Sequence, residues 1–193
     1  MLGTMVIIGI TGTNGAGKGT VVQYLVTKGF THYSARDFIL EEVARRGMPP
    51  TRDSTTEVGN DLRAKHAPDY IISQLLERAL AALGNAVIES VRTPAELALL
   101  RTVLRFYLIA VDAEARIRYE RVSRRGTTLD NISFDTFIEQ ENREMHSDNA
   151  TKQNVGAVIR NADFLIENNG TQDELEASVG KIYRDIFYLT ELG

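Results

Sequence analysis

The stretch that decides the fold is Gly12-Thr13-Asn14-Gly15-Ala16-Gly17-Lys18-Gly19-Thr20. It matches the G-x-x-x-x-G-K pattern of a phosphate-binding loop, in which glycines let backbone N–H groups approach phosphate oxygens closely. The apolar segment 5–11 comes directly before it, and a helical pattern that begins near Gly17 ends at Gly29. The loop is therefore expected between a buried strand and a helix, whose N-terminus favours a bound anion.

The residues of this loop are expected to hold ATP and Mg²⁺. Lys18 is predicted to reach the β- and γ-phosphates, and to face solvent while the loop is empty. Because Gly19 follows the lysine, the hydroxyl group predicted to hold Mg²⁺, directly or through water, is that of Thr20. The alternative is a glycine-rich turn without a ligand. The predicted nucleotide-binding residues are Gly12, Asn14, Gly15, Ala16, Gly17, Lys18, Gly19 and Thr20.

The rest of the chain alternates short apolar segments with longer helical ones, which predicts an α/β fold around a parallel sheet. Strands are expected at 5–11, 31–34, 86–91, 105–111 and 163–167. We therefore predict a single domain over residues 1–193 with a three-layer P-loop NTPase fold. It consists of a five-stranded parallel sheet, helices on both faces and a short lid.

Capping patterns mark where several helices begin. Thr93 and Glu96 form a capping-box pattern, which predicts a helix start. A second helix is expected to begin at Pro68 and is apolar nearly all round. A helix without a polar face is usually buried, so this one is predicted to bury its full apolar set, including Leu80 and Leu83.

Composition excludes several classes of protein. With 43% hydrophobic and 25% charged residues, the chain has the make-up of a soluble globular protein. A net charge of −4 does not favour nucleic-acid binding, and the absence of cysteine excludes disulfides and thiol catalysis. The apolar run Val6–Ile10 is too short for a signal peptide or a membrane span. A cytoplasmic protein without a membrane partner is expected.

The run Gly15–Thr20 resembles adenylate kinase and its nucleoside monophosphate kinase relatives, in which Gly-Lys-Gly-Thr is the usual ending. Ser34-Ala35-Arg36-Asp37 looks like the acceptor-side segment of these kinases, and Glu89-Ser90-Val91-Arg92 looks like their Asp-Gly-…-Arg segment. Arg121 and Arg125 match two arginines at the edge of their lid. The resemblance implies an ATP-dependent kinase.

The later part of the chain resembles a second family. Segment 162–171 is similar to the Ala-Asp-x-x-Ile-x-Asn-x-Gly ending of dephospho-coenzyme A kinase. An archaeal group of kinases that is intermediate between the two families shares the whole layout. Together these resemblances imply an acceptor-binding insertion at about residues 35–83 and a short lid at about residues 121–145.

Three departures from the adenylate kinase pattern bear on the acceptor and the lid. Leu40 stands where adenylate kinase has an arginine for the acceptor phosphate, which argues against AMP as the acceptor. Glu89, not aspartate, ends the third predicted strand, where the resemblance implies that it holds a metal-bound water. Segment 126–132 is too short for a large lid domain, so a short lid is expected.

The remaining candidates each have a functional role and a structural alternative. Asp37 is a base for a hydroxyl acceptor, a positioning group for a phosphate acceptor, or a helix N-cap. Arg92 is expected to bind the acceptor, because ligands bind at the carboxyl ends of parallel strands; a structural ion pair is its alternative. Arg121 and Arg125 are expected to clamp the moving phosphoryl group, or else to form a solvated helix face.

The leading functional hypothesis is a nucleoside monophosphate kinase-like enzyme that moves the γ-phosphoryl group of ATP to a nucleotide-type small molecule. The alternatives are a dephospho-coenzyme A kinase and a nucleotide-binding module without turnover. A GTPase switch is disfavoured, because the sequence has no Asn-Lys-x-Asp segment for guanine. No nucleic-acid partner is expected, and the protein is predicted to be a monomer or a homodimer.

Overall fold

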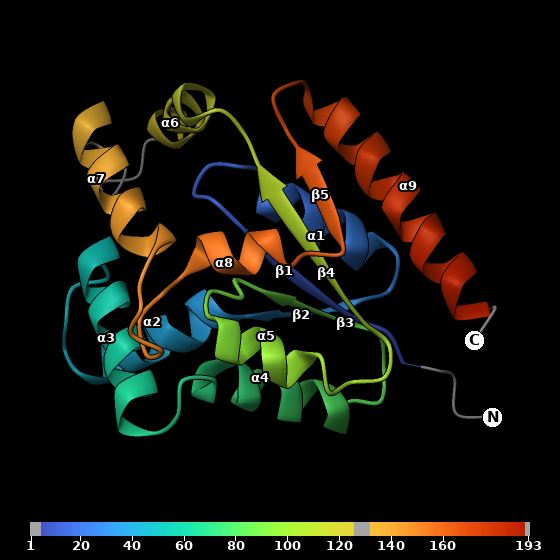
Figure 1. Cartoon of the computed structure of the whole chain (residues 1–193), viewed down its shortest axis with the longest axis horizontal. Helices are drawn as coiled ribbons and strands as arrows, with labels where there is room; N and C mark the ends of the chain where they lie inside the picture. The colour runs from blue at the N-terminus through green and yellow to red at the C-terminus, as the bar shows by residue number, and fades with distance from the viewer. Residues whose placement is uncertain (1–4, 126–131, 192–193) are drawn as a thin grey trace.

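The computed structural model describes residues 5–125 and 132–191, which form an α/β fold around a five-stranded parallel sheet (Figure 1). The strand order is β2-β3-β1-β4-β5. The predicted fold class is therefore confirmed, with strand ends shifted by one or two residues. The strands are β1 (Ile7–Gly12), β2 (Thr31–Ser34), β3 (Ala86–Glu89), β4 (Phe106–Asp112) and β5 (Phe164–Glu167).

Strand β1 lies at the centre of the sheet, between β3 and β4. Every residue of β1 is buried, because a parallel strand in a sheet covered on both faces has no exposed side. Near its end, Ile10 pairs with Glu89 of β3, and Gly12 pairs with Val111 of β4. The carboxyl ends of the strands thus meet at one edge of the sheet, and the phosphate-binding loop leaves β1 at this edge.

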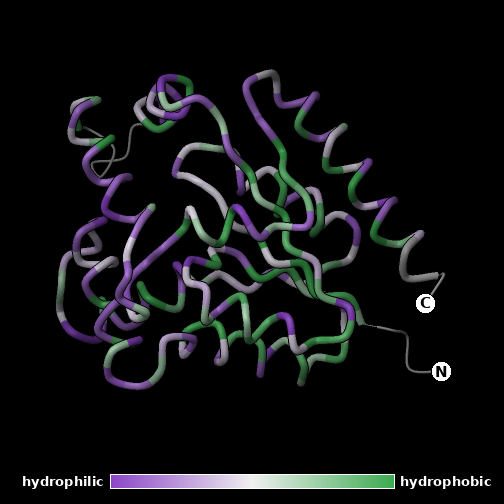
Figure 2. Tube along the Cα trace, in the orientation of Figure 1, coloured by the Kyte–Doolittle hydropathy of each residue, from purple (hydrophilic) through white to green (hydrophobic). Residues whose placement is uncertain are grey.

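Helices cover both faces of the sheet. On one face α1 and α9 pack over β-strand residues such as Ile8 and Ile109, and on the other α2, α4, α5 and α8 pack over residues such as Ile88 and Leu108. In Figure 2 the strands are mostly hydrophobic, whereas α9 alternates hydrophobic and hydrophilic residues along its length. The helices are α1 (Lys18–Thr27), α2 (Ala35–Arg45), α3 (Arg52–Lys65), α4 (Tyr70–Ala81), α5 (Pro94–Leu100), α6 (Ala115–Arg124), α7 (Phe134–Met145), α8 (Val155–Arg160) and α9 (Gln172–Glu191).

The sequence patterns did not predict α3 or α8. Helix α3 buries only two large apolar side chains, Val58 and Leu62, so its apolar periodicity is weak. It begins instead with a capping box in which Thr51 and Ser54 bond each other's backbone N–H groups. Helix α8 has only 6 residues, which is too short for a periodic pattern to be recognised.

The prediction that the helix after Pro68 is buried all round is wrong at its end. Helix α4 buries Ile71 and Ile72 completely, but Leu80 is 43% exposed and Leu83 is 73% exposed. Leu83 follows the helix with φ +55, a left-handed conformation that costs a leucine about 1–2 kcal/mol. The helix therefore turns only one face to the sheet, and its last residues lie at the surface.

The predicted insertion at about 35–83 contains α2, α3 and α4, and the predicted lid at about 121–145 contains the end of α6 and all of α7. Part of that lid, residues 126–131, lies outside the described residues. In the part of the chain that the structure describes, no helix combines the length and apolar character needed to cross a bilayer.

Candidate functional site

The phosphate-binding loop connects β1 to α1, which begins at Lys18. Gly17 is the N-cap of α1 and has φ +104, a left-handed conformation that glycine adopts readily. A Cβ atom at Gly17 would lie 2.5 Å from Nδ2 of Asn168, and one at Gly15 would lie 2.6 Å from the carbonyl oxygen of Arg118. Only glycine therefore fits at these two positions, where later segments of the chain pack against the loop.

The side chain of Lys18 is half-buried and folds back onto its own loop. Its Nζ donates hydrogen bonds to the carbonyl oxygens of Gly12 at 3.1 Å and Thr13 at 2.7 Å. The prediction that Lys18 faces solvent in the empty loop is therefore wrong. The loop holds the ammonium group where its own carbonyl oxygens converge.

Four charged groups from other elements act on the Lys18 ammonium group. Burial lowers the pKa of Lys18 to about 7, and Arg92 and Arg125 lower it as well, whereas Glu89 and Glu144 raise it. The fold thus brings the predicted site residues Arg92, Arg125 and Glu89 together around Lys18. It adds Glu144, which the sequence did not single out.

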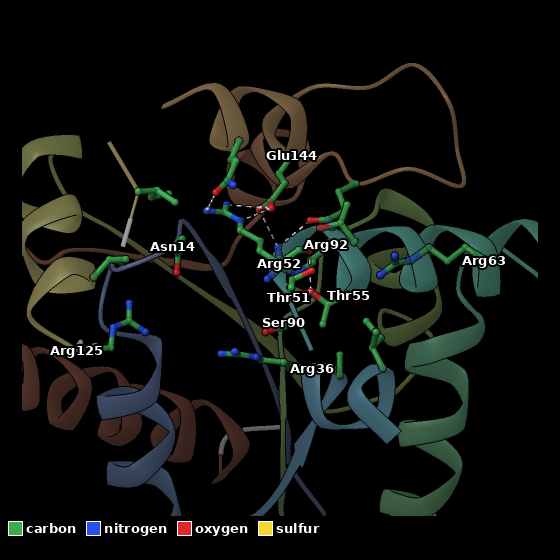
Figure 3. Close-up of a pocket in the computed structure, with 17 residues that line it drawn as sticks. Asn14, Arg36, Thr51, Arg52, Thr55, Arg63, Ser90, Arg92, Arg125 and Glu144 are labelled. Atoms are coloured by element: carbon green, nitrogen blue, oxygen red, sulfur yellow. Dashed lines mark hydrogen bonds and ion pairs between the residues drawn. The ribbon is translucent and has the colours of Figure 1, made fainter. Parts of the chain in front are cut away.

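A cavity of about 310 Å³ opens beside the loop and reaches α2, α3 and α7 (Figure 3). Among its described lining residues there are five arginines but only one carboxylate, that of Glu144. Such an excess of positive charge favours an anionic ligand. The arginines are Arg36, Arg52, Arg63, Arg92 and Arg125, and the hydroxyl-bearing residues of the lining are Thr51, Thr55, Thr56 and Ser90.

One carboxylate holds two of these arginines. Nη1 of Arg92 donates to Oε2 of Glu144 at 3.1 Å and to Oε1 of Gln153 at 2.7 Å, and Nε of Arg52 donates to Oε1 of Glu144 at 3.0 Å. Arg92 is therefore in a structural ion pair, as the alternative for it held, and it also lines the cavity. Glu144 connects α7 to α3 and to the segment after β3.

The segment after β3 has an unusual backbone. Ser90 has φ +73, which is uncommon for a residue with a side chain, and its N–H donates to the carbonyl oxygen of Ile10 at 2.9 Å. Strained residues of this kind persist where the surrounding structure fixes them, and they cluster at functional sites. The conformation ends β3 at Glu89 and places Ser90 in the lining of the cavity.

Glu89 is held in its ionised form. Burial by itself would raise the pKa of Glu89, but a hydrogen bond with His32 and the charges of Lys18 and Arg92 hold it below its ordinary value. Nε2 of His32 on β2 lies 3.1 Å from Oε2 of Glu89. A carboxylate that stays ionised at the end of a central strand suits the binding of a hydrated cation.

Residues 8–149 match a family model described as an AAA domain, and this match covers the loop, the cavity's arginines and most of the chain. The chain belongs to this family. Among the relatives of this AAA-domain protein is a UPF0200 protein of Thermococcus kodakarensis, which is 29% identical over 188 residues that span 94% of this chain and 98% of the relative.

Solved structures of two kinases share the fold of this AAA-domain protein. Shikimate kinase from Bacteroides thetaiotaomicron is similar with a TM-score of 0.60 at 15% identity, over 93% of this chain and 97% of that one. Dephospho-CoA kinase from Campylobacter jejuni is similar with a TM-score of 0.51 at 15% identity, over 95% and 98%. These similarities support a P-loop kinase-like fold. They do not confirm a specific likeness to adenylate kinase.

Asp37 lies outside the cavity lining, in the first turn of α2, and is exposed. The N-cap alternative for Asp37 is wrong, because Ser34 is the N-cap and its Oγ accepts the N–H of Asp37 at 3.1 Å. The charged residue of α2 that does line the cavity is its neighbour, Arg36. The fold thus brings Arg36 to the site where the sequence analysis had singled out Asp37.

Arg121 and Arg125, the two arginines expected at the edge of the lid, make different contacts. Arg125 lines the cavity of the AAA-domain protein, at the C-terminal end of α6. Arg121 donates instead from Nη1 to the carbonyl oxygen of Asn168 at 2.8 Å and from Nη2 to that of Gly170 at 3.0 Å. Arg121 therefore fixes the segment between β5 and α9.

Arg118 was not among the site residues predicted from the sequence. It is only 4% exposed, and its guanidinium group pairs with Glu141 of α7 through both Nη1 and Nη2. Nε donates to the carbonyl oxygen of Ala113 at 2.6 Å, and Nη1 to that of Asn14 at 3.4 Å. Arg118 therefore contacts the backbone of the phosphate-binding loop and helps to fix its position. No local signal distinguishes it from its exposed neighbours.

The donor set of this AAA-domain protein fits a magnesium nucleotide. Thr20 lies in the first turn of α1 and Glu89 at the end of β3. Within residues 5–125 and 132–191, no group of three acidic, histidine or cysteine side chains could cage a metal ion. Mg²⁺ that arrives with ATP keeps several waters and needs only one or two protein oxygens, which Thr20 and Glu89 offer.

Proposed function

We propose that this AAA-domain protein transfers the γ-phosphoryl group of ATP to an anionic, nucleotide-type small molecule. The observation that carries the proposal is the position of Lys18, whose pKa is lowered to about 7 in a glycine-rich loop beside a cavity lined by five arginines. The titles of the structural neighbours name kinases of small molecules, which supports phosphoryl transfer but leaves the acceptor open.

The loop is proposed to bind the triphosphate through its backbone N–H groups and the N-terminus of α1. Lys18 exchanges the carbonyl oxygens of its loop for the γ-phosphate. Arg92 and Arg125, which line the cavity, stabilise the negative charge that spreads over the phosphoryl oxygens during transfer. Thr20 and Glu89 would hold Mg²⁺, which would neutralise negative charge on the nucleotide.

In this reaction the bond between the γ-phosphorus and the β–γ bridging oxygen breaks, and an acceptor oxygen bonds to the phosphorus, leaving ADP. A phosphate acceptor is already anionic, so it needs no general base. Asp37, which is exposed at the start of α2, is therefore proposed to orient the acceptor or metal waters and not to remove a proton. Arg121 is proposed to act by holding the 168–170 segment beside the loop.

ADP formation in the presence of ATP and Mg²⁺ tests this function, with nucleoside monophosphates and dephospho-coenzyme A as acceptors. Acceptor-dependent ADP formation is expected, and Lys18→Ala should reduce kcat/KM by about a hundredfold or more, because a cation that stabilises the charge of the transferred group is lost. The matched control is Lys28→Ala, which removes an exposed lysine at the other end of α1 and should leave turnover unchanged.

The same assay separates the alternatives. ADP formation with dephospho-coenzyme A alone would identify the protein as a dephospho-coenzyme A kinase, and would reject the nucleoside monophosphate acceptor. Tight ATP binding without ADP formation on any acceptor would reject turnover and leave a nucleotide-binding module.

A further inference from the structure

Arg63 is a buried cavity arginine with no part in the proposed transfer. Arg63 of α3 is only 1% exposed, and in Figure 3 its guanidinium group points from α3 toward the other lining residues. Nε donates to Oε1 of Glu96 at 2.9 Å, and Nη2 lies 2.8 Å from the same oxygen. Among the described residues, neither Nη1 nor Nη2 makes a hydrogen bond. A buried donor without an acceptor requires an explanation.

The partner of Arg63 cannot turn to satisfy Nη1. Oε2 of Glu96 accepts the backbone N–H groups of Arg92 at 2.7 Å and Thr93 at 3.1 Å, which caps the start of α5. Glu96 is 0% exposed, so its carboxylate is fixed between these two N–H groups and the Arg63 side chain. Nη1 is therefore held beside the cavity with no acceptor from Glu96.

A glycine in α3 leaves space beside the guanidinium group of Arg63. A Cβ atom at Gly59, one turn before Arg63 in α3, would lie 3.3 Å from Nη1 of Arg63 and 3.1 Å from Cδ1 of Ile39. Glycine weakens the interior of a helix, so its use here is unfavourable for α3 alone. It allows two lining residues, Arg63 and Ile39, to lie close together.

The chemistry of this end of the cavity selects an oxygen without a full charge. A guanidinium group offers only donors, so a ligand amino group facing Nη1 would leave two donors opposed. Glu96 already compensates the charge of Arg63, and a further carboxylate or phosphate would be buried next to Glu96. A neutral keto oxygen meets both conditions.

The position of Arg63 in the cavity determines which part of a bound acceptor contacts it. In Figure 3, Asn14 of the phosphate-binding loop and Arg125 lie at the opposite end of the labelled residues from Arg63. Phosphate groups belong at the loop end, where Lys18 lies, and the hydroxyl-bearing residues Thr55 and Ser90 lie between the two ends. The part of a nucleotide farthest from its phosphate is the base.

We propose that Arg63 selects acceptor nucleotides whose base presents a keto oxygen, at position 6 of a purine or position 4 of a pyrimidine. Nucleotides with an amino group at that position are disfavoured. The inference rests on the proposed nucleotide-type acceptor.

Binding, not turnover, tests this inference. Isothermal calorimetry on the full chain, with a non-hydrolysable ATP analogue and Mg²⁺ present, compares GMP with AMP and UMP with CMP. The wild-type protein should bind the keto member of each pair about tenfold or more tightly, the usual effect of one hydrogen bond to a charged donor. The double variant Arg63→Met/Glu96→Gln should lose this preference.

The double variant is chosen because it leaves no unpaired buried carboxylate, and glutamine still completes a capping box. The matched control is Arg46→Met, which removes a half-buried arginine paired with Glu42 and Asp61 outside the cavity lining, and should keep the preference. A melting curve of each variant confirms that it is folded.

An unchanged preference in the folded double variant would overturn the inference, as would a wild-type protein that binds both members of each pair equally or binds none of them. Keto-selective binding that depends on Arg63, without any ADP formation, would reject the proposed transfer and leave the inference in place. If the double variant forms ADP and still prefers nucleotides with a keto base as strongly as the wild type, the inference is rejected and the proposed transfer remains in place.

Discussion

Arg92, in the segment after β3, and Glu144, in α7, form an ion pair in the cavity wall, with Nη1 of Arg92 3.1 Å from Oε2 of Glu144. The pair joins the edge of the sheet, where the phosphate-binding loop lies, to α7, a helix of the predicted lid. An anion that enters the cavity meets Arg92 already engaged, so it competes with Glu144 for the guanidinium group.

The variant Glu144→Gln should therefore bind anionic acceptors more tightly. Removing the only carboxylate among the described lining residues leaves Arg52 and Arg92 without a competing charge. We expect the KM of the acceptor to fall about threefold to tenfold, in the range of the net contribution of an ordinary hydrogen bond. Steady-state kinetics measure it, with Glu139→Gln, an exposed carboxylate of the same helix, as the control. A raised KM in Glu144→Gln would contradict this competition.

Nucleotide binding should take up a proton above pH 7. Burial lowers the pKa of Lys18 to about 7 from an ordinary value of 10.5, and a bound phosphate should restore the charged form. At pH 8 the uptake should be close to one proton, and affinity should fall about tenfold per pH unit above 7. Calorimetry in buffers of different ionisation enthalpy measures the uptake. Lys18→Arg, which stays charged, should show none.

The same pKa predicts how the stability of the ligand-free protein depends on pH. Between pH 7 and 10.5 the unfolded chain carries a proton on Lys18 that the folded chain has lost. The unfolded state then binds more protons, so this residue makes folding more favourable as pH rises through that window. Urea unfolding of wild type and Lys18→Met should diverge there. Parallel curves would show that the pKa is not depressed.

The variant Gly19→Ala should stabilise the ligand-free protein and weaken its binding of ATP. A Cβ atom at Gly19 would meet no atom within 4 Å, so alanine fits the ligand-free protein and should stabilise α1 by up to about 1 kcal/mol. If that space receives a phosphate or its magnesium, the methyl group must weaken ATP binding. Melting curves with and without Mg·ATP test both effects. An unchanged ATP affinity would show that the nucleotide does not reach Gly19.

Breaking the pair of Arg118 and Glu141 should destabilise the fold more than replacing both partners. The two side chains are 5% and 15% exposed, and removal of one partner leaves a buried charge, which costs about 3–5 kcal/mol. Glu141→Leu alone should therefore unfold at lower urea than Arg118→Met/Glu141→Leu. Equal midpoints would show that the pair makes no direct contribution. Arg124, whose partner Glu120 is exposed, gives the control Arg124→Met with little effect.

The fold and the centre of the site could be predicted because their signals are local. A strand buried on both faces reads as a continuous apolar run, as β1 does, and all five strands lie within two residues of their predicted bounds. Lys18, Glu89 and Arg92 follow from the loop and from the rule that ligands bind at the carboxyl ends of strands. Helix α3 could not be predicted, because its buried residues include Arg63 and only two large apolar side chains.

The sequence by itself determined that this chain folds around a parallel sheet with a phosphate-binding loop at its centre, since glycine spacing and apolar runs act over a few residues. Tertiary structure alone decided which arginines line the cavity and which stabilise the fold through ion pairs and hydrogen bonds. Arg118 and Arg121 lie three residues apart, yet one pairs with Glu141 and the other binds the 168–170 segment. Their partners come from segments remote in the chain, and only folding brings these charges within hydrogen-bond distance.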